Sequence, residues 1–145
     1  MQNIIYTVLF VVILLTSCQK SDENDNLVIS AGFACGWGTG ADSIDISKSE
    51  IQYVYYVPAE SMLPKIKGRR SITESEWYDI KSAIKIDEFL KLDYNSCNIC
   101  VDGCDEWIAI QNDQISHSIR YSKGLKIENL EKLQSVIASI RSEFN

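Results

Sequence analysis

The chain has a single histidine among its 145 residues, and its 14 Lys and Arg are outnumbered by 20 Asp and Glu. One imidazole excludes the histidine-rich zinc sites, which need several such ligands. The resulting formal net charge of −6 repels a phosphate backbone, so we expect no nucleic acid partner. The basic cluster at residues 65–70 is interpreted as a solvated loop.

Charge is absent from residues 1–17, which contain an apolar run from Val8 to Leu15. This run is too short to span a bilayer and is typical of an export signal. It ends in Leu15-Thr16-Ser17-Cys18, which resembles the lipobox of bacterial lipoproteins, although no Lys or Arg precedes the run. The resemblance implies a signal peptide over residues 1–17 and acylation of Cys18, with palmitate among the fatty acids.

Residues 19–26, which follow Cys18, include no apolar side chain. Such a composition cannot bury surface, so we expect residues 18–26 to be a lipidated cysteine followed by an acidic tether. Lys20 followed by acidic residues resembles the signal that carries Bacteroidota lipoproteins to the outer cell surface. The segment therefore predicts an outer membrane lipoprotein, either surface-exposed or facing the periplasm, whose membrane partner is bound through the lipid anchor.

Residues 27–145 are enough for one hydrophobic core and too few for two, so we expect a single domain. Hydrophobic alternation and turn residues predict strands at 27–34, 42–47, 51–57, 106–110 and 115–121, and helical periodicity predicts helices at 71–84 and 127–140. The fold class is therefore α+β: a small antiparallel sheet of about five strands with two main helices packed on one face, stapled by disulfides.

Local signals support two of these elements. Thr73 and Glu76 form a capping box at the start of the first helix. Asn112-Asp113 favours a two-residue hairpin loop, which would place Ile110 opposite Ile115. The lone histidine, His117, then falls in an apolar row and is interpreted as a packed core residue.

Four cysteines remain once Cys18 is assigned to lipid: Cys35, Cys97, Cys100 and Cys104. An even number in an exported domain predicts two disulfides, one of which must join Cys35 to the later cluster. That long bridge would stabilise the domain by about 4 kcal/mol, against about 2 kcal/mol for a short one. All three connectivities remain open.

Other interpretations of these segments compete. The four thiolates could enclose a structural zinc, or Cys97-x-x-Cys100 could be a redox-active dithiol. The glycines at 36–40 fit a dinucleotide-binding pattern, but a strand follows them where that pattern needs a helix. Glycan binding would require an exposed indole at one of the three tryptophans, Trp37, Trp77 and Trp107.

The order of landmarks resembles a family of uncharacterised Bacteroidota lipoprotein domains of unknown function. The resemblance is carried by Cys35-Gly36 before a hairpin, Glu76-Trp77 in a helix, residues 89–94, a late hairpin and a final helix. It implies an α+β fold and assigns no catalytic residue, cofactor or metal. We expect a non-enzymatic binding or envelope-interaction module with a protein or glycan partner; the alternative is a thiol-redox or metal-binding protein that uses the four cysteines.

Overall fold

The computed structural model describes residues 26–144. Within this range no helix is long and apolar enough to cross a membrane. The strands are β1 (Val28–Cys35), β2 (Ala41–Ile46), β3 (Glu50–Tyr56), β4 (Ile66–Ser71), β5 (Cys104–Gln111) and β6 (Ser116–Ser122). The helices are α2 (Glu74–Ser82), α3 (Ile86–Phe89) and α4 (Glu131–Ser142), and the short 3-10 turns are η1 (Gly36–Gly38) and η2 (Asn98–Val101).

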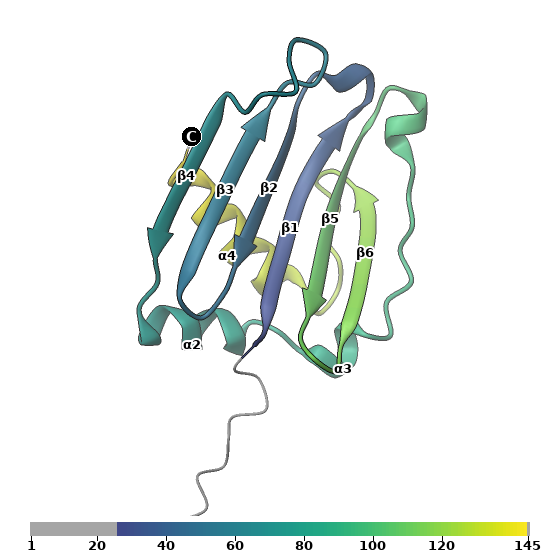
Figure 1. The fold of residues 1–145 in the computed structure, drawn as a ribbon. Coiled ribbons are helices and arrows are strands. Elements are labelled where there is room, and N and C mark those ends of the chain that lie inside the picture. The colour runs from purple at the N-terminus through teal and green to yellow at the C-terminus, as the bar shows by residue number, and fades with distance from the viewer. Residues whose placement is uncertain (1–25, 145) are drawn as a thin grey trace, which may run out of the picture.

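The strands form one antiparallel sheet in the order β4-β3-β2-β1-β5-β6 (Figure 1). β1 is central, as expected for a strand that is apolar on both faces. The described chain begins at Asn26, at the end of the sheet where β1 starts. At the opposite end lie η1, the β3–β4 connection and η2, which we call the loop end (Figure 1).

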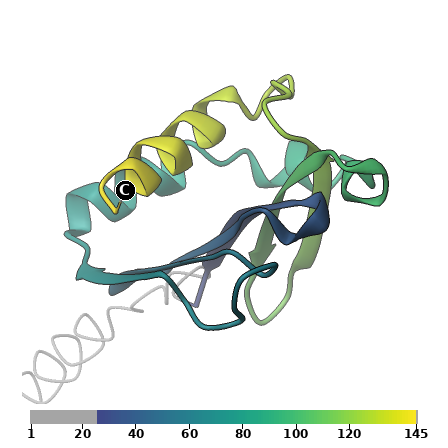
Figure 2. The ribbon, with the colours of Figure 1, turned by 90° about the horizontal axis from the view of Figure 1, so that it is seen from above.

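One face of the sheet carries the hydrophobic core. Side chains alternate between the two faces of a strand, and the buried positions are Ile29, Ala31, Ile44, Ile46, Ile51, Tyr53, Ile108, Ile110, Ile119 and Tyr121. Trp77 and Ile80 of α2 and Leu133, Ile137 and Ile140 of α4 belong to the same core. Figure 2 shows α2 and α4 on the same side of the sheet. The α+β class is confirmed, and among residues 26–144 no helix covers the other face of the sheet, which we call the open face.

Each of the two longer helices begins for a local reason. Thr73 caps α2, because its Oγ1 accepts a hydrogen bond from the backbone N–H of Glu76 at 3.2 Å. This half of the predicted capping box is confirmed. α4 starts at Glu131, four residues later than expected. Asn129 has a φ of 69°, in the left-handed region, which interrupts a right-handed helix.

The sheet has six strands rather than the five expected, because residues 66–71 form β4. Residues 65–70 were expected to form a loop, but Gly68 lies within the strand, opposite Tyr53. A Cβ at Gly68 would overlap the ring of Phe144. Phe144 in turn stacks on Tyr53, with ring centroids 5.2 Å apart. The glycine therefore serves close packing and not a turn.

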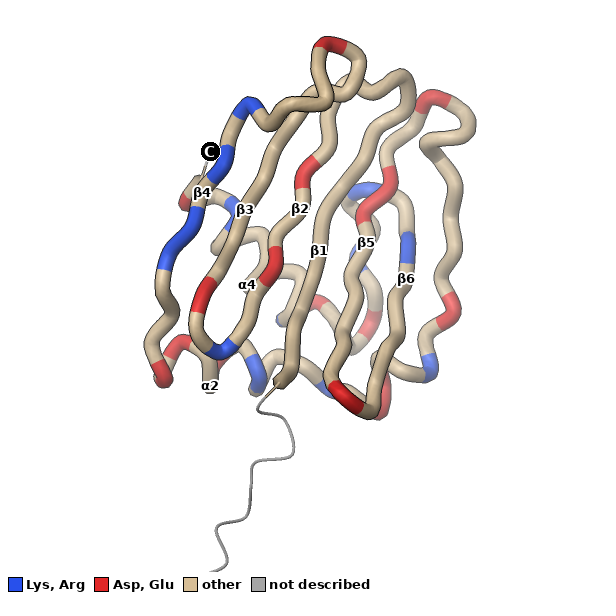
Figure 3. Tube along the Cα trace, viewed as in Figure 1, with Lys and Arg blue, Asp and Glu red and all other residues tan. Residues whose placement is uncertain are grey.

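The cations of the basic cluster lie along this edge strand (Figure 3). Arg69 pairs with Glu50 of the neighbouring strand. The Arg70 guanidinium pairs with Glu76 of α2 at 2.6 Å and with Glu143, just beyond α4, at 2.7 Å. The prediction of a loop is wrong, although Lys65, Lys67 and Arg69 are exposed as expected. Arg70 fixes the sheet edge to both helices, and cations on an edge strand discourage pairing with another chain.

The β5–β6 hairpin has a longer loop than predicted. Ile110 pairs with His117 and Gln111 with Ser116, which leaves residues 112–115 in the loop. Asn112 Oδ1 accepts hydrogen bonds from the backbone N–H groups of Gln114 and Ile115, at 2.8 and 2.7 Å. This side-chain turn makes the longer loop favourable. The two-residue shift leaves the inward-facing row unchanged.

Candidate functional site

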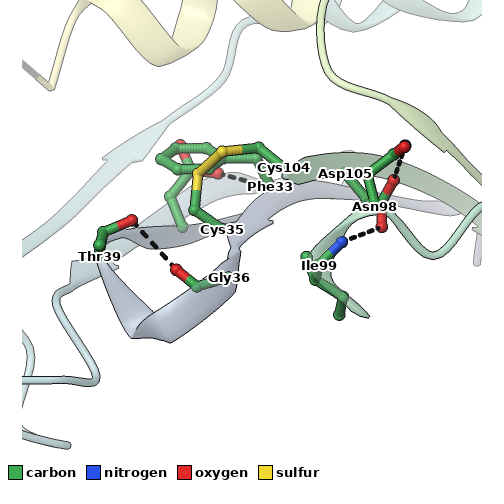
Figure 4. Close-up of a disulfide and its surroundings, with 9 residues drawn as sticks. Phe33, Cys35, Gly36, Thr39, Asn98, Ile99, Cys104 and Asp105 are labelled. Carbon is green, nitrogen blue, oxygen red and sulfur yellow. Dashed lines mark hydrogen bonds between the residues drawn. A yellow bond between two sulfur atoms is a disulfide. The ribbon is translucent and has the colours of Figure 1, made fainter. Parts of the chain in front are cut away.

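Both expected disulfides are present. Cys35 ends β1 and Cys104 begins β5, and the two are direct partners across the sheet. Their sulfurs are 2.00 Å apart, and the bridge joins residues 69 positions apart in sequence (Figure 4). The long bridge therefore holds the two central strands together at the loop end.

The second disulfide joins Cys97 to Cys100 across the η2 turn. The Cys100 N–H also donates to the Cys97 carbonyl at 3.1 Å. Asp102, just after the turn, has a φ of 64°. Both cysteines are exposed, so this bridge is open to solvent, whereas the Cys35–Cys104 bridge is half-buried.

The buried carboxylate of Asp105 accepts several hydrogen bonds from the η2 segment. Its Oδ1 accepts hydrogen bonds from Ser96 Oγ at 2.6 Å and Asn98 Nδ2 at 2.7 Å, and its Oδ2 accepts one from the Ile99 N–H at 3.2 Å (Figure 4). Burial acts to raise the pKa of Asp105, but these hydrogen bonds outweigh it and lower the pKa below its usual range. The ionised carboxylate of Asp105 therefore holds the turn that carries Cys97 and Cys100 in place by hydrogen bonds.

Hydrogen bonds join the three segments of the loop end. The Gly36 N–H donates to the Gly103 carbonyl at 2.8 Å, and the Ala59 N–H donates to the Gly38 carbonyl at 3.0 Å. A Cβ at Gly36 would lie 2.8 Å from the Asp102 Cα, so this close approach needs glycine. Backbone hydrogen bonds thus join η1 to the segment that follows η2 and to the β3–β4 connection, so the three segments lie next to one another at the loop end.

A polar cluster lies inside the core side of the sheet, beneath α4. The buried Asp42 Oδ2 pairs with Arg141 Nε at 2.9 Å, and Asp42 Oδ1 accepts the Phe33 N–H at 3.0 Å. Tyr53 Oη donates to Asp42 Oδ2 at 3.3 Å. Burial raises the pKa of Asp42 despite Arg141, and burial beside Asp42 raises the pKa of Tyr53 to about 12.

This cluster borders a small cavity of about 100 Å³ between β1, β5, β6 and α4. Glu106, Gln134 and Arg141 are among its lining residues. Gln134 is occupied within the fold, since its Nε2 donates to the Leu125 carbonyl at 2.8 Å and its Oε1 accepts the Ile127 N–H at 3.2 Å. The cluster beside this cavity therefore has a structural role, because the ion pair between Asp42 and Arg141 joins β2 to α4.

A larger hollow of about 440 Å³ lies at the β6 edge of the sheet. It is lined by Asp93, Tyr94, Asn95, Trp107, Ser118, Ile119 and Arg120. Trp107 and Arg120 are direct partners on β5 and β6, and they project from the open face, because Ile108 and Ile119 beside them point into the core. We call this hollow the edge groove.

Four of the five predicted site residues lie within the described part of the chain, and the fifth does not. Cys18 lies outside the described residues, so its lipidation stays a prediction. The remaining four cysteines form two pairs at the loop end. Sequence reasoning missed Asp42 and Asp105, the buried carboxylates. Asp42 alternates with Ile44 and Ile46, so its position on the buried face could have been read from the pattern.

No family model matches the chain, and a search of curated proteins finds no match. The resemblance to Bacteroidota lipoprotein domains therefore stays a prediction from residues alone.

Proposed function

We propose that the protein is an outer membrane lipoprotein, anchored through lipid on Cys18, whose folded domain is a non-enzymatic binding or envelope-interaction module. The support for the anchor is the spacing of Leu15 and Cys18 after an uncharged apolar run. The support for binding is the surface at the loop end.

Four large apolar side chains are exposed there: Trp37, Met62, Leu63 and Val101, between 76% and 80% exposed. They come from three segments that the hydrogen bonds described above hold together. Exposed large apolar side chains gathered at one end of a domain are typical of interaction sites. This surface lies at the end of the sheet opposite Asn26, where the described chain begins (Figure 1). A tether attached at Asn26 would hold the domain with its loop end facing away from the membrane.

We expect a photo-crosslinking residue at Met62 to capture an envelope partner in intact cells. The same residue at Tyr78 of α2, which is 73% exposed and lies away from the loop end, is the matched control and should capture nothing specific.

Cys18→Ala should release the protein from the membrane fraction and remove fatty acid label.

Three results would count against this function. Equal crosslinks at both positions would show that the loop end is not a specific contact, and no crosslink from Met62 would do the same. Retention of label and membrane attachment in Cys18→Ala would disprove the anchor.

A second candidate function, thiol-disulfide exchange, is favoured by the exposed Cys97–Cys100 bridge. A partner protein dithiol would attack one of these sulfurs to form a mixed disulfide and release the other as a thiolate. The partner's second thiolate would then resolve the intermediate, which leaves Cys97 and Cys100 reduced and the partner oxidised. The metal-binding alternative needs four thiolates together, whereas the structure pairs all four cysteines in disulfides.

Graded reduction followed by alkylation and mass mapping discriminates between the two functions. A structural bridge is expected to have a reduction potential below about −300 mV, and an exchange-active bridge a higher one. We expect the exposed Cys97–Cys100 bridge to be reduced first, but at a potential in the structural range. A potential near −200 mV would instead favour exchange activity.

A further inference from the structure

We propose that the edge groove is a binding site for a neutral saccharide, with the indole of Trp107 as its stacking platform. This site lies on the open face of the sheet and is separate from the loop end. The argument rests on four features: an aromatic plate, uncommitted polar side chains, balanced charge and rigid walls.

The aromatic plate is set by Gly32, the β1 partner of Trp107. A Cβ at Gly32 would lie 2.8 Å from Cε2 and Cζ2 of Trp107. The indole therefore lies over the backbone of β1 and is held against the sheet. Trp107 is half-buried and is among the residues that line the groove, which its indole borders on the side of β1. An aromatic face with its negative quadrupole suits the C–H face of a pyranose ring.

The polar side chains around this plate are available to a ligand. Among residues 26–144, no hydrogen bond or ion pair of the fold engages the side chains of Asp93, Asn95, Ser118 or Arg120. Arg120 contributes donors, Asp93 contributes acceptors, and Asn95 and Ser118 contribute both. Sugar hydroxyls donate and accept at once, so this mixed set suits them better than a ligand of one polarity.

The charges of the groove select a neutral ligand. Arg120 and Asp93 place one positive and one negative side chain around the same hollow. A phosphorylated or carboxylated sugar would meet Asp93 as well as Arg120, and like charges that face each other across a binding site are unfavourable. A neutral saccharide can use both groups as hydrogen-bonding partners.

The outer wall of the groove is built before any ligand arrives. Residues 94–96 run beside β6: the Arg120 N–H donates to the Tyr94 carbonyl at 2.9 Å, and the Ser96 N–H donates to the Arg120 carbonyl at 3.0 Å. A preformed site loses little entropy on binding. The volume of about 440 Å³ also falls within the roughly 300–1,000 Å³ of small-molecule sites.

The other two tryptophans lack this setting. Trp77 is 5% exposed in the core, and Trp37 is 80% exposed on a loop tip. Trp107 alone of the three combines a plate, a hollow and polar neighbours.

The test is a fluorescence titration of the full chain, purified in a detergent without a sugar headgroup. Trp37→Phe removes the exposed indole, so a change in signal then reports mainly on Trp107. The probes are neutral hexasaccharides of glucose, xylose, mannose and N-acetylglucosamine, with a glucuronate hexasaccharide as the charged comparison. We expect a saturable change with at least one neutral probe and a Kd at least tenfold weaker for the charged one.

Variants locate the site. Arg120→Ala and Trp107→Phe should each weaken the Kd at least tenfold, measured for all variants by isothermal titration calorimetry because Trp107→Phe lacks the reporting indole, while circular dichroism confirms that they fold. Lys67→Ala is the matched control: Lys67 projects from the same open face but lies on β4 at the other edge, so its Kd should not change. No saturable change with any neutral probe would overturn the proposal, as would unchanged binding in the folded Arg120→Ala variant or preference for the charged probe.

Discussion

We expect the double variant Cys35→Ala, Cys104→Ala to lose about 4 kcal/mol of unfolding free energy. The bridge closes a loop of 69 residues, and in the chain-entropy model its main effect is to restrict the unfolded chain. The native sheet loses little directly, because hydrogen-bonded pairs from Val28 to Ala34 still join β1 to β5. Urea denaturation followed by far-UV circular dichroism measures the difference.

The exposed bridge provides the control. Cys97 and Cys100 are 3 residues apart, so the same model gives about 2 kcal/mol for Cys97→Ala, Cys100→Ala. The order of the two losses is the critical result. If the short bridge proves the more stabilising, then loop-closure entropy does not govern this domain, and the Cys35–Cys104 bridge would have to be strained or redundant.

The sequence was sufficient for the parts of the fold that depend on local pattern. Alternation in residues 51–57 and the capping residue Thr73 predict a strand and a helix start, and both are present. β4 was missed because the clustered cations of residues 65–70 favour a solvated loop locally. The strand depends on a long-range contact, because Phe144 from the end of the chain fills the space above Gly68. A contact between residues so far apart in sequence cannot be predicted from local pattern.

The candidate sites divide in the same way. Cysteine counting predicted two disulfides but left three connectivities, since pairing depends on where β1 and β5 meet. The edge groove could not be predicted at all, because Asn95 and Trp107 come together only when residues 94–96 bind along β6. The hairpin shows the limit of register: its loop length was wrong by two residues, yet Ile119 still faces inward because the side-chain period of a strand is also two.

Asp105→Ala is expected to cost about 3 kcal/mol, since it removes an ionised acceptor that receives three hydrogen bonds from half-buried donors. The donors are Ser96 Oγ, Asn98 Nδ2 and the Ile99 N–H. Asp105→Asn keeps one oxygen acceptor and should cost less. The loss should be concentrated in the η2 segment, so limited proteolysis of residues 96–103 should accelerate in the Ala variant. Asp79→Ala, an exposed position on α2, is the control and should change stability by less than about 0.5 kcal/mol.

The pH dependence separates the charge of Asp105 from its shape. The pKa of Asp105 is lower in the folded protein than the ordinary value of about 3.9. Its ionised form therefore stabilises the fold fully above that ordinary value, and this contribution is lost as the pH falls through the folded pKa. The stability difference between the wild type and Asp105→Asn should then be constant from pH 7 to pH 5 and should shrink toward pH 3 in urea denaturation. A difference that persists unchanged at pH 3 would mean that Asp105 holds the η2 turn by hydrogen-bond geometry alone, with no contribution from its charge.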